Sequence, residues 1–321
     1  MKIAFVGKGG SGKTTLASLF ARYLASGNFP VLAIDADINQ HLGVMLGMPE
    51  KEAAAIPPMG IQVARIKEYL RGTNPYISSS ETMVKTTPPG PGSRLLTIAE
   101  ANPIYEYFER SAGGVRLMAT GPFTEEDLGV KCYHSKVGAV ELFLNHLIDG
   151  KGEYVLVDMT AGADTFASGM FTKFDVTFLV LEPTIHSVSV FRQYLQYAEG
   201  YGVQIYAVGN KVENDDDVRF LKEHAGDRLL GYVARSGYVR SISKGERLPI
   251  GGLEPENIRA LDRMKEAVDR QEKDWDKFYM QTIQFHVKNA ESWASAAVGE
   301  DIRKQADASF PFPSIASRLA I

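Results

Sequence analysis

Two hydrophobic patterns alternate through residues 1–252. Short continuous apolar runs, bounded by glycine, proline or a carboxylate, predict buried strands at residues 3–6, 31–35, 115–119, 153–158, 176–181, 203–208 and 229–233. Segments whose apolar residues recur every three or four positions predict helices at residues 16–24, 136–148, 186–199 and 218–224. This alternation favours an α/β fold with a doubly wound, mainly parallel sheet flanked by helices, as in P-loop nucleotide-binding proteins.

Two stretches depart from that pattern. Residues 50–114 are punctuated by proline and glycine and contain one helical segment at 61–70, which is typical of an insert made largely of loops. From Glu256 onward the chain is mostly helical, with aromatic residues at three- to four-residue spacing over 257–298. We therefore expect a domain over residues 1–255, interrupted by the insert, and a helical C-terminal extension over 256–321.

The strongest motif joins the first predicted strand to the first predicted helix. It consists of Gly7, Lys8, Gly9, Gly10, Ser11, Gly12, Lys13, Thr14 and Thr15. Strand, glycine-rich loop and helix are the setting in which this spacing predicts a phosphate-binding P-loop. Glycines let backbone N–H groups turn toward a phosphate, and the helix N-terminus favours negative charge. Lys13 can reach the β- and γ-phosphates of ATP, and the Thr14 hydroxyl can join the ligands of Mg²⁺.

Carboxylates stand at the ends of two other predicted strands. Asp35 and Asp37 follow the second strand, and Asp158 ends the strand at 153–158. The carboxyl ends of parallel strands share one edge of the sheet, so these acids can meet the P-loop, orient water and hold Mg²⁺. Each acid taken alone could instead cap the helix or turn that follows it. The P-loop upstream favours the magnesium role for Asp158.

Composition limits the function classes. The chain has 321 residues, 45% of them hydrophobic, and 35 Lys+Arg against 39 Asp+Glu give a net charge of −4, which makes nucleic-acid binding a poor expectation. No apolar run is long enough to span a bilayer, and the first strand begins at Ile3, so we expect a cytoplasmic protein without a transmembrane segment. One cysteine excludes an internal disulfide framework.

The P-loop, with its second lysine at position 8, resembles the deviant Walker A motif of the MinD, ParA and nitrogenase iron-protein class of ATPases. The resemblance implies a dimer that encloses two ATP molecules, with Lys8 reaching the phosphates held by the partner subunit. A solvated surface lysine is the alternative. Asp37 then matches the acid that orients or activates the attacking water, and Asp158 the Walker B acid that holds Mg²⁺.

The same resemblance assigns residues further along the chain. Gly162 matches the glycine of switch II (residues 159–164) that senses the γ-phosphate, and Asn210 the asparagine that recognises the base. On residue type alone, a turn is the commoner role for such an asparagine. Lys211 lies beside Asn210, and Arg235 lies in a loop that matches the adenine side of the site but has Ala234 and Ser236 in place of the usual proline and aspartate. We expect Lys211 and Arg235 to contact the nucleotide.

Within this class, residues 33–37, 157–162 and 208–212 resemble most closely the CooC-type nickel-insertion ATPases that mature carbon-monoxide dehydrogenase. Members of that subfamily share a metal between two subunits through a Cys-x-Cys motif, where this chain has Cys132-Tyr133-His134. Cys132 and His134 from two subunits could form a tetrahedral site for Zn²⁺ or Ni²⁺. Alternatively, the motif has lost its metal and Cys132 is an ordinary buried thiol.

These patterns together predict a Mg²⁺- and ATP-dependent homodimeric ATPase with Lys8, Lys13 and Asp37 as its catalytic residues. Its nucleotide cycle would drive a conformational switch on a client protein, which the CooC resemblance suggests is a metalloenzyme. The alternatives are a ParA- or MinD-like positioning ATPase and a regulatory module that binds ATP without hydrolysing it. A nitrogenase-type reductase is disfavoured, because one cysteine per chain supplies too few thiolates for a subunit-bridging iron–sulfur cluster.

Overall fold

The computed structural model describes residues 1–122, 133–160, 166 and 169–320, except the side chains of residues 133–135. The described part contains an eight-stranded sheet in the order β10-β9-β8-β1-β7-β2-β5-β4. All neighbouring strands in it are parallel except β4 and β5. The strands are β1 (Lys2–Gly7), β2 (Val31–Ala36), β4 (Arg110–Ala112), β5 (Val115–Ala119), β7 (Tyr154–Met159), β8 (Val176–Leu181), β9 (Ile205–Val212) and β10 (Leu229–Ala234). The predicted mainly parallel sheet is confirmed.

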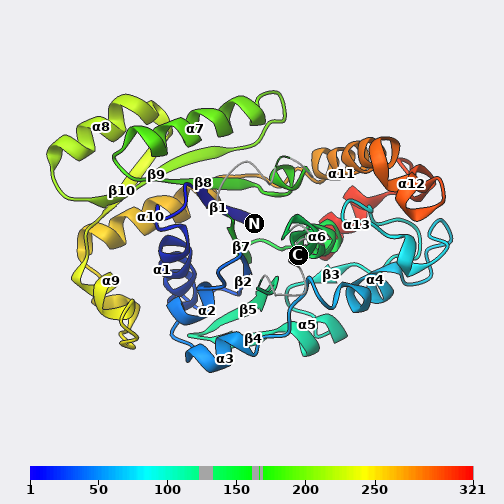
Figure 1. Ribbon diagram of the computed structural model, residues 1–321, viewed down its shortest axis with the longest axis horizontal. Helices are drawn as coiled ribbons and strands as arrows, with labels where there is room; N and C mark the ends of the chain where they lie inside the picture. Colours follow the sequence, from blue (N-terminus) through cyan, green and yellow to red (C-terminus); the bar gives the residue numbers. More distant parts are fainter. Residues whose placement is uncertain (123–132, 161–165, 167–168, 321) are drawn as a thin grey trace.

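The central strands are buried on both faces, which explains their continuous apolar runs. Ala4 and Val6 of β1 point into a core formed with α6 (Tyr133–His146), α7 (Ile185–Ala198) and α8 (Asp215–Ala225). Ile3 and Phe5 point into a second core on the opposite face. That face is covered by α1 (Lys13–Ser26), α9 (Gly237–Ile242) and α10 (Pro255–Asp269), which Figure 1 shows together beside the sheet.

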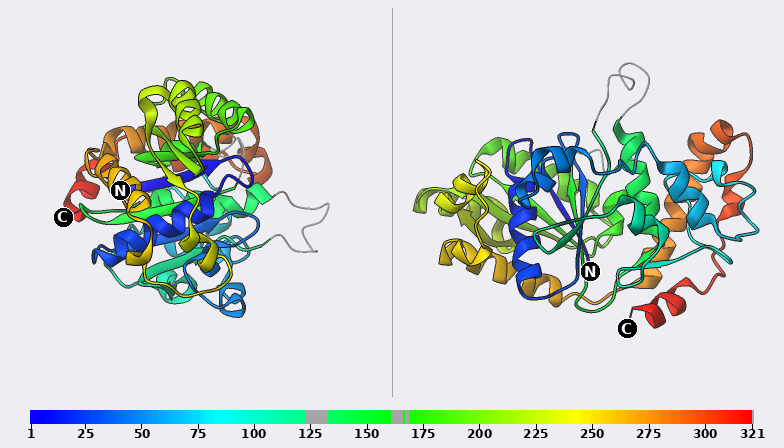
Figure 2. Two further views of the ribbon diagram at one scale, coloured as in Figure 1. Left: turned by 90° about the vertical axis from the view of Figure 1, so that its left-hand side faces the viewer. Right: turned by 90° about the horizontal axis from the view of Figure 1, so that it is seen from below.

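The insert and the C-terminal extension form one lobe. Helix α2 (Leu42–Met45) precedes the insert and contacts α1. The insert contains α3 (Glu50–Ala54), α4 (Val63–Arg71), η1 (Ser80–Thr82), α5 (Pro103–Phe108) and the short strand β3 (Leu96–Thr97), which pairs with β6 (Leu147–Ile148). The extension contains α11 (Trp275–Asn289), a π-helical turn (Ala290–Ala294), α12 (Ser295–Val298) and α13 (Phe312–Leu319). Both views place α4 and η1 beside α11 and α12 (Figures 1 and 2).

Hydrogen bonds between buried groups hold the lobe together. Thr87 donates to Gln305 (3.1 Å), and the Tyr279 hydroxyl donates to the carbonyl of Pro89 (3.0 Å). Thr86 contacts the Nδ1 atom of His286 at 3.3 Å. The sequence predicted the two segments separately, and their close packing could not be deduced from either one.

An ion cluster joins the extension to the amino end of β1. The buried Lys2 ammonium lies 2.8 Å from Asp149, and Lys273 lies 2.7 Å from Asp149 and 2.5 Å from Asp175. Lys2 also lies over the rings of Trp275 and Phe278, at 4.8 and 4.6 Å from their centroids. The extension is thereby fixed to the first strand of the sheet.

Several element boundaries differ from the predictions. The helical region at 257–298 is interrupted between α10 and α11, and residues 147–148 form β6 rather than the end of a helix. Strand β9 extends to Val212, so Asn210 and Lys211 lie within a strand instead of after it. Within the described residues, no helix is long and apolar enough to cross a membrane.

Candidate functional site

The loop between β1 and α1 has the geometry expected of a phosphate-binding loop. Strand β1 ends at Gly7 and α1 begins at Lys13. Helix α1 has no side-chain cap at Gly12 and no acidic residue in its first turn. Its first N–H groups are therefore available to an anion, and the helix dipole favours one there.

Asn210 fixes the shape of this loop. Its amide nitrogen donates to the carbonyl oxygen of Ser11 at 2.7 Å, and its side chain is 7% exposed. Gly12 has a φ of 91°, and a Cβ atom there would lie 2.1 Å from the same amide nitrogen, so only glycine fits. Asn210 thus clamps the P-loop from β9, and its oxygen is left to accept a hydrogen bond from elsewhere. Contact with the adenine base stays a prediction.

Lys211 and Arg235 lie beside the same loop. The Lys211 ammonium donates to the carbonyl of Gly10 and to Glu182, both at 2.6 Å. Arg235 pairs with Glu213 at 2.6 Å and is largely exposed. Glu182 was not predicted as a site residue, although its place at the end of β8 puts it on the same edge of the sheet as the P-loop.

A cleft of about 600 Å³ opens next to these residues. It is lined by Gly12, Thr15, Asn210, Lys211, Val233, Ala234, Arg235, Ser236, Gly237, Val239 and Arg240. The cleft begins at the P-loop and extends along α9, so it can receive the nucleoside of a nucleotide whose phosphates lie on the loop. Predicted nucleotide-binding residues that are about 200 positions apart in the sequence, such as Gly12 and Asn210, therefore line one cleft.

The three predicted acids come together at the carboxyl ends of β2 and β7. Asp35 pairs in register with Asp158 across the two strands. Asp35 accepts hydrogen bonds from the backbone N–H groups of Leu42 (2.8 Å) and Asp37 (3.2 Å), so it fulfils the capping alternative. Asp37 lies with its Oδ2 atom 3.7 Å from the Lys13 ammonium. Lys13 and Asp37 thus lie next to each other at the P-loop.

Asp158 is buried, and no ion pair within the described residues compensates for the desolvation of its carboxylate. Neither of its carboxylate oxygens has a hydrogen-bond partner of standard geometry among the described residues. Burial raises the pKa of Asp158 to about 7, and the nearby Thr14 hydroxyl and Lys13 ammonium only partly oppose that rise. Burial and the neighbouring Asp158 also raise the pKa of Asp35 well above its usual range.

A divalent cation fits this donor set. Mg²⁺ prefers carboxylate and hydroxyl oxygens, which Asp158 and Thr14 supply together with the phosphates of a bound nucleotide. A bound cation would also offset the desolvation of Asp158, which Thr14 and Lys13 offset only in part.

The remaining predicted residues cannot be placed in the same way. Gly162 and Cys132 lie outside the described residues. His134 lies in the first turn of α6, but its side chain is not among those described. Among the described residues there is no group of three or more His, Cys, Asp or Glu side chains that could hold a metal ion. The transition-metal site stays a prediction.

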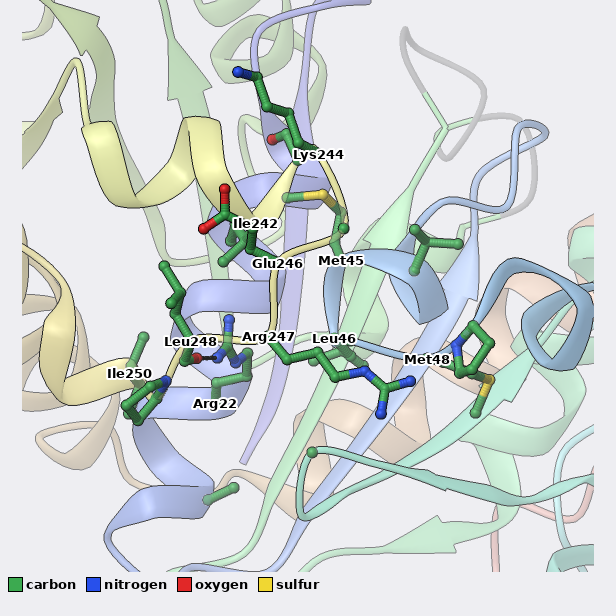
Figure 3. Close-up of a pocket in the computed structure, with 18 of the residues that line it drawn as sticks. Arg22, Met45, Leu46, Met48, Ile242, Lys244, Glu246, Arg247, Leu248 and Ile250 are labelled. Carbon is green, nitrogen blue, oxygen red and sulfur yellow. Dashed lines mark hydrogen bonds between the residues drawn. The ribbon is translucent and has the colours of Figure 1, made fainter.

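A larger cleft, of about 820 Å³, lies away from the P-loop (Figure 3). The end of α1, the α2–α3 connection and residues 242–250 form its walls. Arg22 crosses it and donates to the carbonyl of Leu248. None of the predicted nucleotide-binding residues lines it, so we assign the nucleotide to the cleft beside Asn210.

Comparison with known proteins identifies the chain as a nucleotide-binding domain. Residues 3–250 match the CobQ/CobB/MinD/ParA nucleotide binding domain. Over 246 residues the chain is 29% identical to the carbon monoxide dehydrogenase accessory protein CooC of Rhodospirillum rubrum, covering 76% of this chain and 87% of that protein. It is 28% identical over 252 residues to an uncharacterised ATP-binding protein of Methanocaldococcus jannaschii, covering 77% and 89%.

Solved structures share the fold. The cell division ATPase MinD of Pyrococcus furiosus superposes with a TM-score of 0.55 at 16% identity, covering 83% of this chain and 98% of that one. An ATP complex of a McdA variant from Cyanothece gives the same TM-score and identity over 85% and 97%.

Proposed function

The chain belongs to the CobQ/CobB/MinD/ParA family of nucleotide-binding domains, and from that premise we propose that it is a Mg²⁺-dependent ATPase that works as a homodimer. The observation that carries the proposal is that an uncapped P-loop helix lies beside Asp37, which pairs with Lys13, and beside the buried Asp158, which has no ion-pair partner among the described residues. A module that only held ATP would not need Asp37 and Asp158 directed at the same space as Lys13.

Each described residue of the candidate site named below has a role in the proposed reaction. The first N–H groups of α1 and the Lys13 ammonium bind and orient the phosphates. Asp37, beside Lys13, orients a water molecule toward the γ-phosphate. Mg²⁺, held by Asp158 and Thr14, would neutralise phosphate charge. Asn210 and Lys211 keep the loop in its binding shape through their bonds to Ser11 and Gly10.

Lys8 supports a dimeric site. It is exposed on the loop, so its ammonium can approach phosphates held by a second subunit. The charge it would bring adds to that of Lys13 as negative charge develops on the transferred group. One subunit by itself would therefore hydrolyse ATP slowly.

Turnover measured against protein concentration tests this proposal. Wild-type specific activity should rise with concentration as dimers form, and Lys8→Ala should bind ATP but show low activity that does not rise. Lys51→Ala, which removes an exposed lysine on α3, is the matched control and should behave as wild type. Concentration-dependent activity in Lys8→Ala would contradict the dimeric site, and absence of hydrolysis in the wild type would contradict the ATPase itself.

We further propose that the ATPase serves metal insertion into a client metalloenzyme, on the basis of its similarity to CooC. Cys132 and His134 of two subunits would hold the metal. Elemental analysis after loading with Ni²⁺ or Zn²⁺ should find one metal per ATP-bound dimer in the wild type and none in Cys132→Ser. A metal-free wild-type dimer would count against metal insertion and leave the ATPase untouched.

A further inference from the structure

One segment of the chain forms most of the wall of the nucleotide cleft. Gly12, Thr15, Asn210 and Lys211 line the phosphate end, and every other lining residue lies within residues 233–240. This segment, which we call the wall, runs from the end of β10 into α9. A nucleoside in the cleft therefore lies between the P-loop and the wall, so its fit depends on what holds the wall in place.

Glu254, at the start of α10, accepts two hydrogen bonds from the wall. The Ser236 hydroxyl donates to its Oε2 atom at 2.6 Å, and the Tyr238 N–H donates to its Oε1 atom at 3.3 Å. The Glu254 side chain does not cap its own helix, so its carboxylate serves the wall instead. Burial raises the pKa of Glu254, but the hydrogen bonds it accepts, that from Ser236 foremost, outweigh this effect and lower the pKa.

Asn257 holds the same wall from one helical turn further along α10. It is 1% exposed, and its Oδ1 atom accepts a hydrogen bond from the Ala234 N–H at 2.8 Å. Its amide nitrogen donates to the Oε2 atom of Glu254 at 3.1 Å. The Ser236 hydroxyl oxygen also accepts from the Val239 N–H at 2.9 Å. One connected hydrogen-bond network therefore links the start of α10 to the wall.

The phosphate end of the cleft is held by different contacts. Asn210 and Lys211 bind backbone carbonyls of the P-loop from β9. The pairing of β10 with β9 is irregular between Val233 and Ala234, so the regular strand ladder ends where the wall begins. Loss of the bonds from α10 should therefore shift the wall and leave the P-loop in its binding shape.

We infer that Glu254 and Asn257 are positioning residues for the nucleoside, which hold the wall at the distance from the P-loop that a bound nucleotide needs. The inference rests on the proposed function, because it takes ATP as the occupant of the cleft. Neither residue is among those that line the cleft, so both act through the wall. Both also lie outside residues 3–250, so the family match gives them no role.

Calorimetric titration with two probes tests this role. The non-hydrolysable ATP analogue AMP-PNP occupies both ends of the cleft, whereas inorganic tripolyphosphate occupies only the phosphate end. Glu254→Ala should raise the Kd of AMP-PNP roughly tenfold, because the wall is less often in its binding position, and should keep the Kd of tripolyphosphate within about twofold of wild type. Glu254→Gln keeps an oxygen that can accept from Ser236, so its affinity for AMP-PNP should lie between the two.

Glu256→Ala is the matched control, since it removes an exposed carboxylate from the first turn of the same helix. It should bind both probes as wild type does. If Glu254→Ala binds AMP-PNP like wild type, or loses affinity for tripolyphosphate to the same extent, the positioning role is wrong while the ATPase stands. A wild-type protein that binds AMP-PNP but does not hydrolyse ATP would contradict the ATPase alone. Absence of AMP-PNP binding in the wild type would overturn both.

Discussion

Buried acids lie at both ends of the strands of the central sheet, but they are paired with cations to very different extents at the amino end (the amino edge) and the carboxyl end (the carboxyl edge). At the amino edge, the acids Asp149 and Asp175 are paired with the ammonium groups of Lys2 and Lys273 at 2.5–2.8 Å. At the carboxyl edge, Asp37 lies 3.7 Å from the Lys13 ammonium, and among the described residues Asp35 and Asp158 have no ion-pair partner. At the amino edge, lysines of the chain itself neutralise the buried acids. At the carboxyl edge, a bound cation would have to supply the missing positive charge.

The pKa shifts follow this difference. Lys2 and Lys273 hold the pKa of Asp149 well below its usual range even though burial raises it. At the opposite edge, burial raises the pKa of Asp158 to about 7 because no equivalent partner among the described residues opposes it. Buried charge by itself is therefore no sign of function. The useful sign is a buried acid that the protein leaves without compensation.

We expect the largest effect on stability from a substitution at the amino edge, where Asp149 is paired with Lys2 and Lys273. Asp149→Asn leaves the Lys2 ammonium buried without its acid, so it should lower the free energy of unfolding by about 4 kcal/mol. Urea unfolding measures this change. The control is Asp216→Asn, which breaks an exposed pair with Arg219 and should change nothing measurable. A small loss in Asp149→Asn would mean that the cluster is not the anchor described here.

Lys13→Ala removes the cation that faces the acids of the carboxyl edge. ATP turnover should fall by roughly 10²–10³-fold, which corresponds to about 3–4 kcal/mol of transition-state stabilisation. A coupled phosphate-release assay measures it, with circular dichroism to verify folding. Wild-type-like turnover in this variant would sink the proposed mechanism.

Asp158→Asn should have the opposite sign from Asp149→Asn in the unfolding experiment. An amide replaces a desolvated carboxylate, so the nucleotide-free protein should gain roughly 1–3 kcal/mol at pH 8 while Mg²⁺-dependent turnover is lost. If both variants are destabilised alike, the two edges do not differ as we describe.

The pH dependence gives the smallest effect when it is expressed per pH unit. The folded pKa of Asp158 is raised from 3.8 to about 7, so wild-type stability is lost relative to Asp158→Asn as pH rises through that window, by about 1 kcal/mol per pH unit. Burial lowers the pKa values of His146 and His286 to about 4. Both proteins therefore lose stability from these two residues as pH falls below 6.5. The difference between the two proteins therefore removes the histidine contributions and reports Asp158 together with Asp35, whose pKa Asp158 raises. A difference that does not vary with pH would contradict the raised pKa.

Local patterns were sufficient to predict the parallel strands of the sheet and the acids of the site, but not the short antiparallel strand β4. Strands buried on both faces produce continuous apolar runs, and parallel strands bring their carboxyl ends to one edge, so Asp35 and Asp158 could be placed together. Lys13 and Gly12 followed from the P-loop spacing. These features depend on contacts that are close in sequence or repeated by the fold.

Contacts between distant segments could not be predicted. Lys2 carries no sign in the sequence that Asp149 and Lys273 will surround it. Asn210 was expected to contact the base, and the sequence did not show that one of its two amide hydrogens is donated to the Ser11 carbonyl. The acceptor of this hydrogen bond is a backbone carbonyl, which every residue type has, so the sequence holds no pattern that predicts it.

The joint lobe also has a consequence for synthesis on the ribosome. Residues such as Thr82 and Thr87 have their hydrogen-bond partner, Gln305, more than 200 positions later in the chain. At roughly 5–20 residues per second, translation leaves the insert without that partner for about 10–45 seconds. Final assembly therefore follows translation of the last helices.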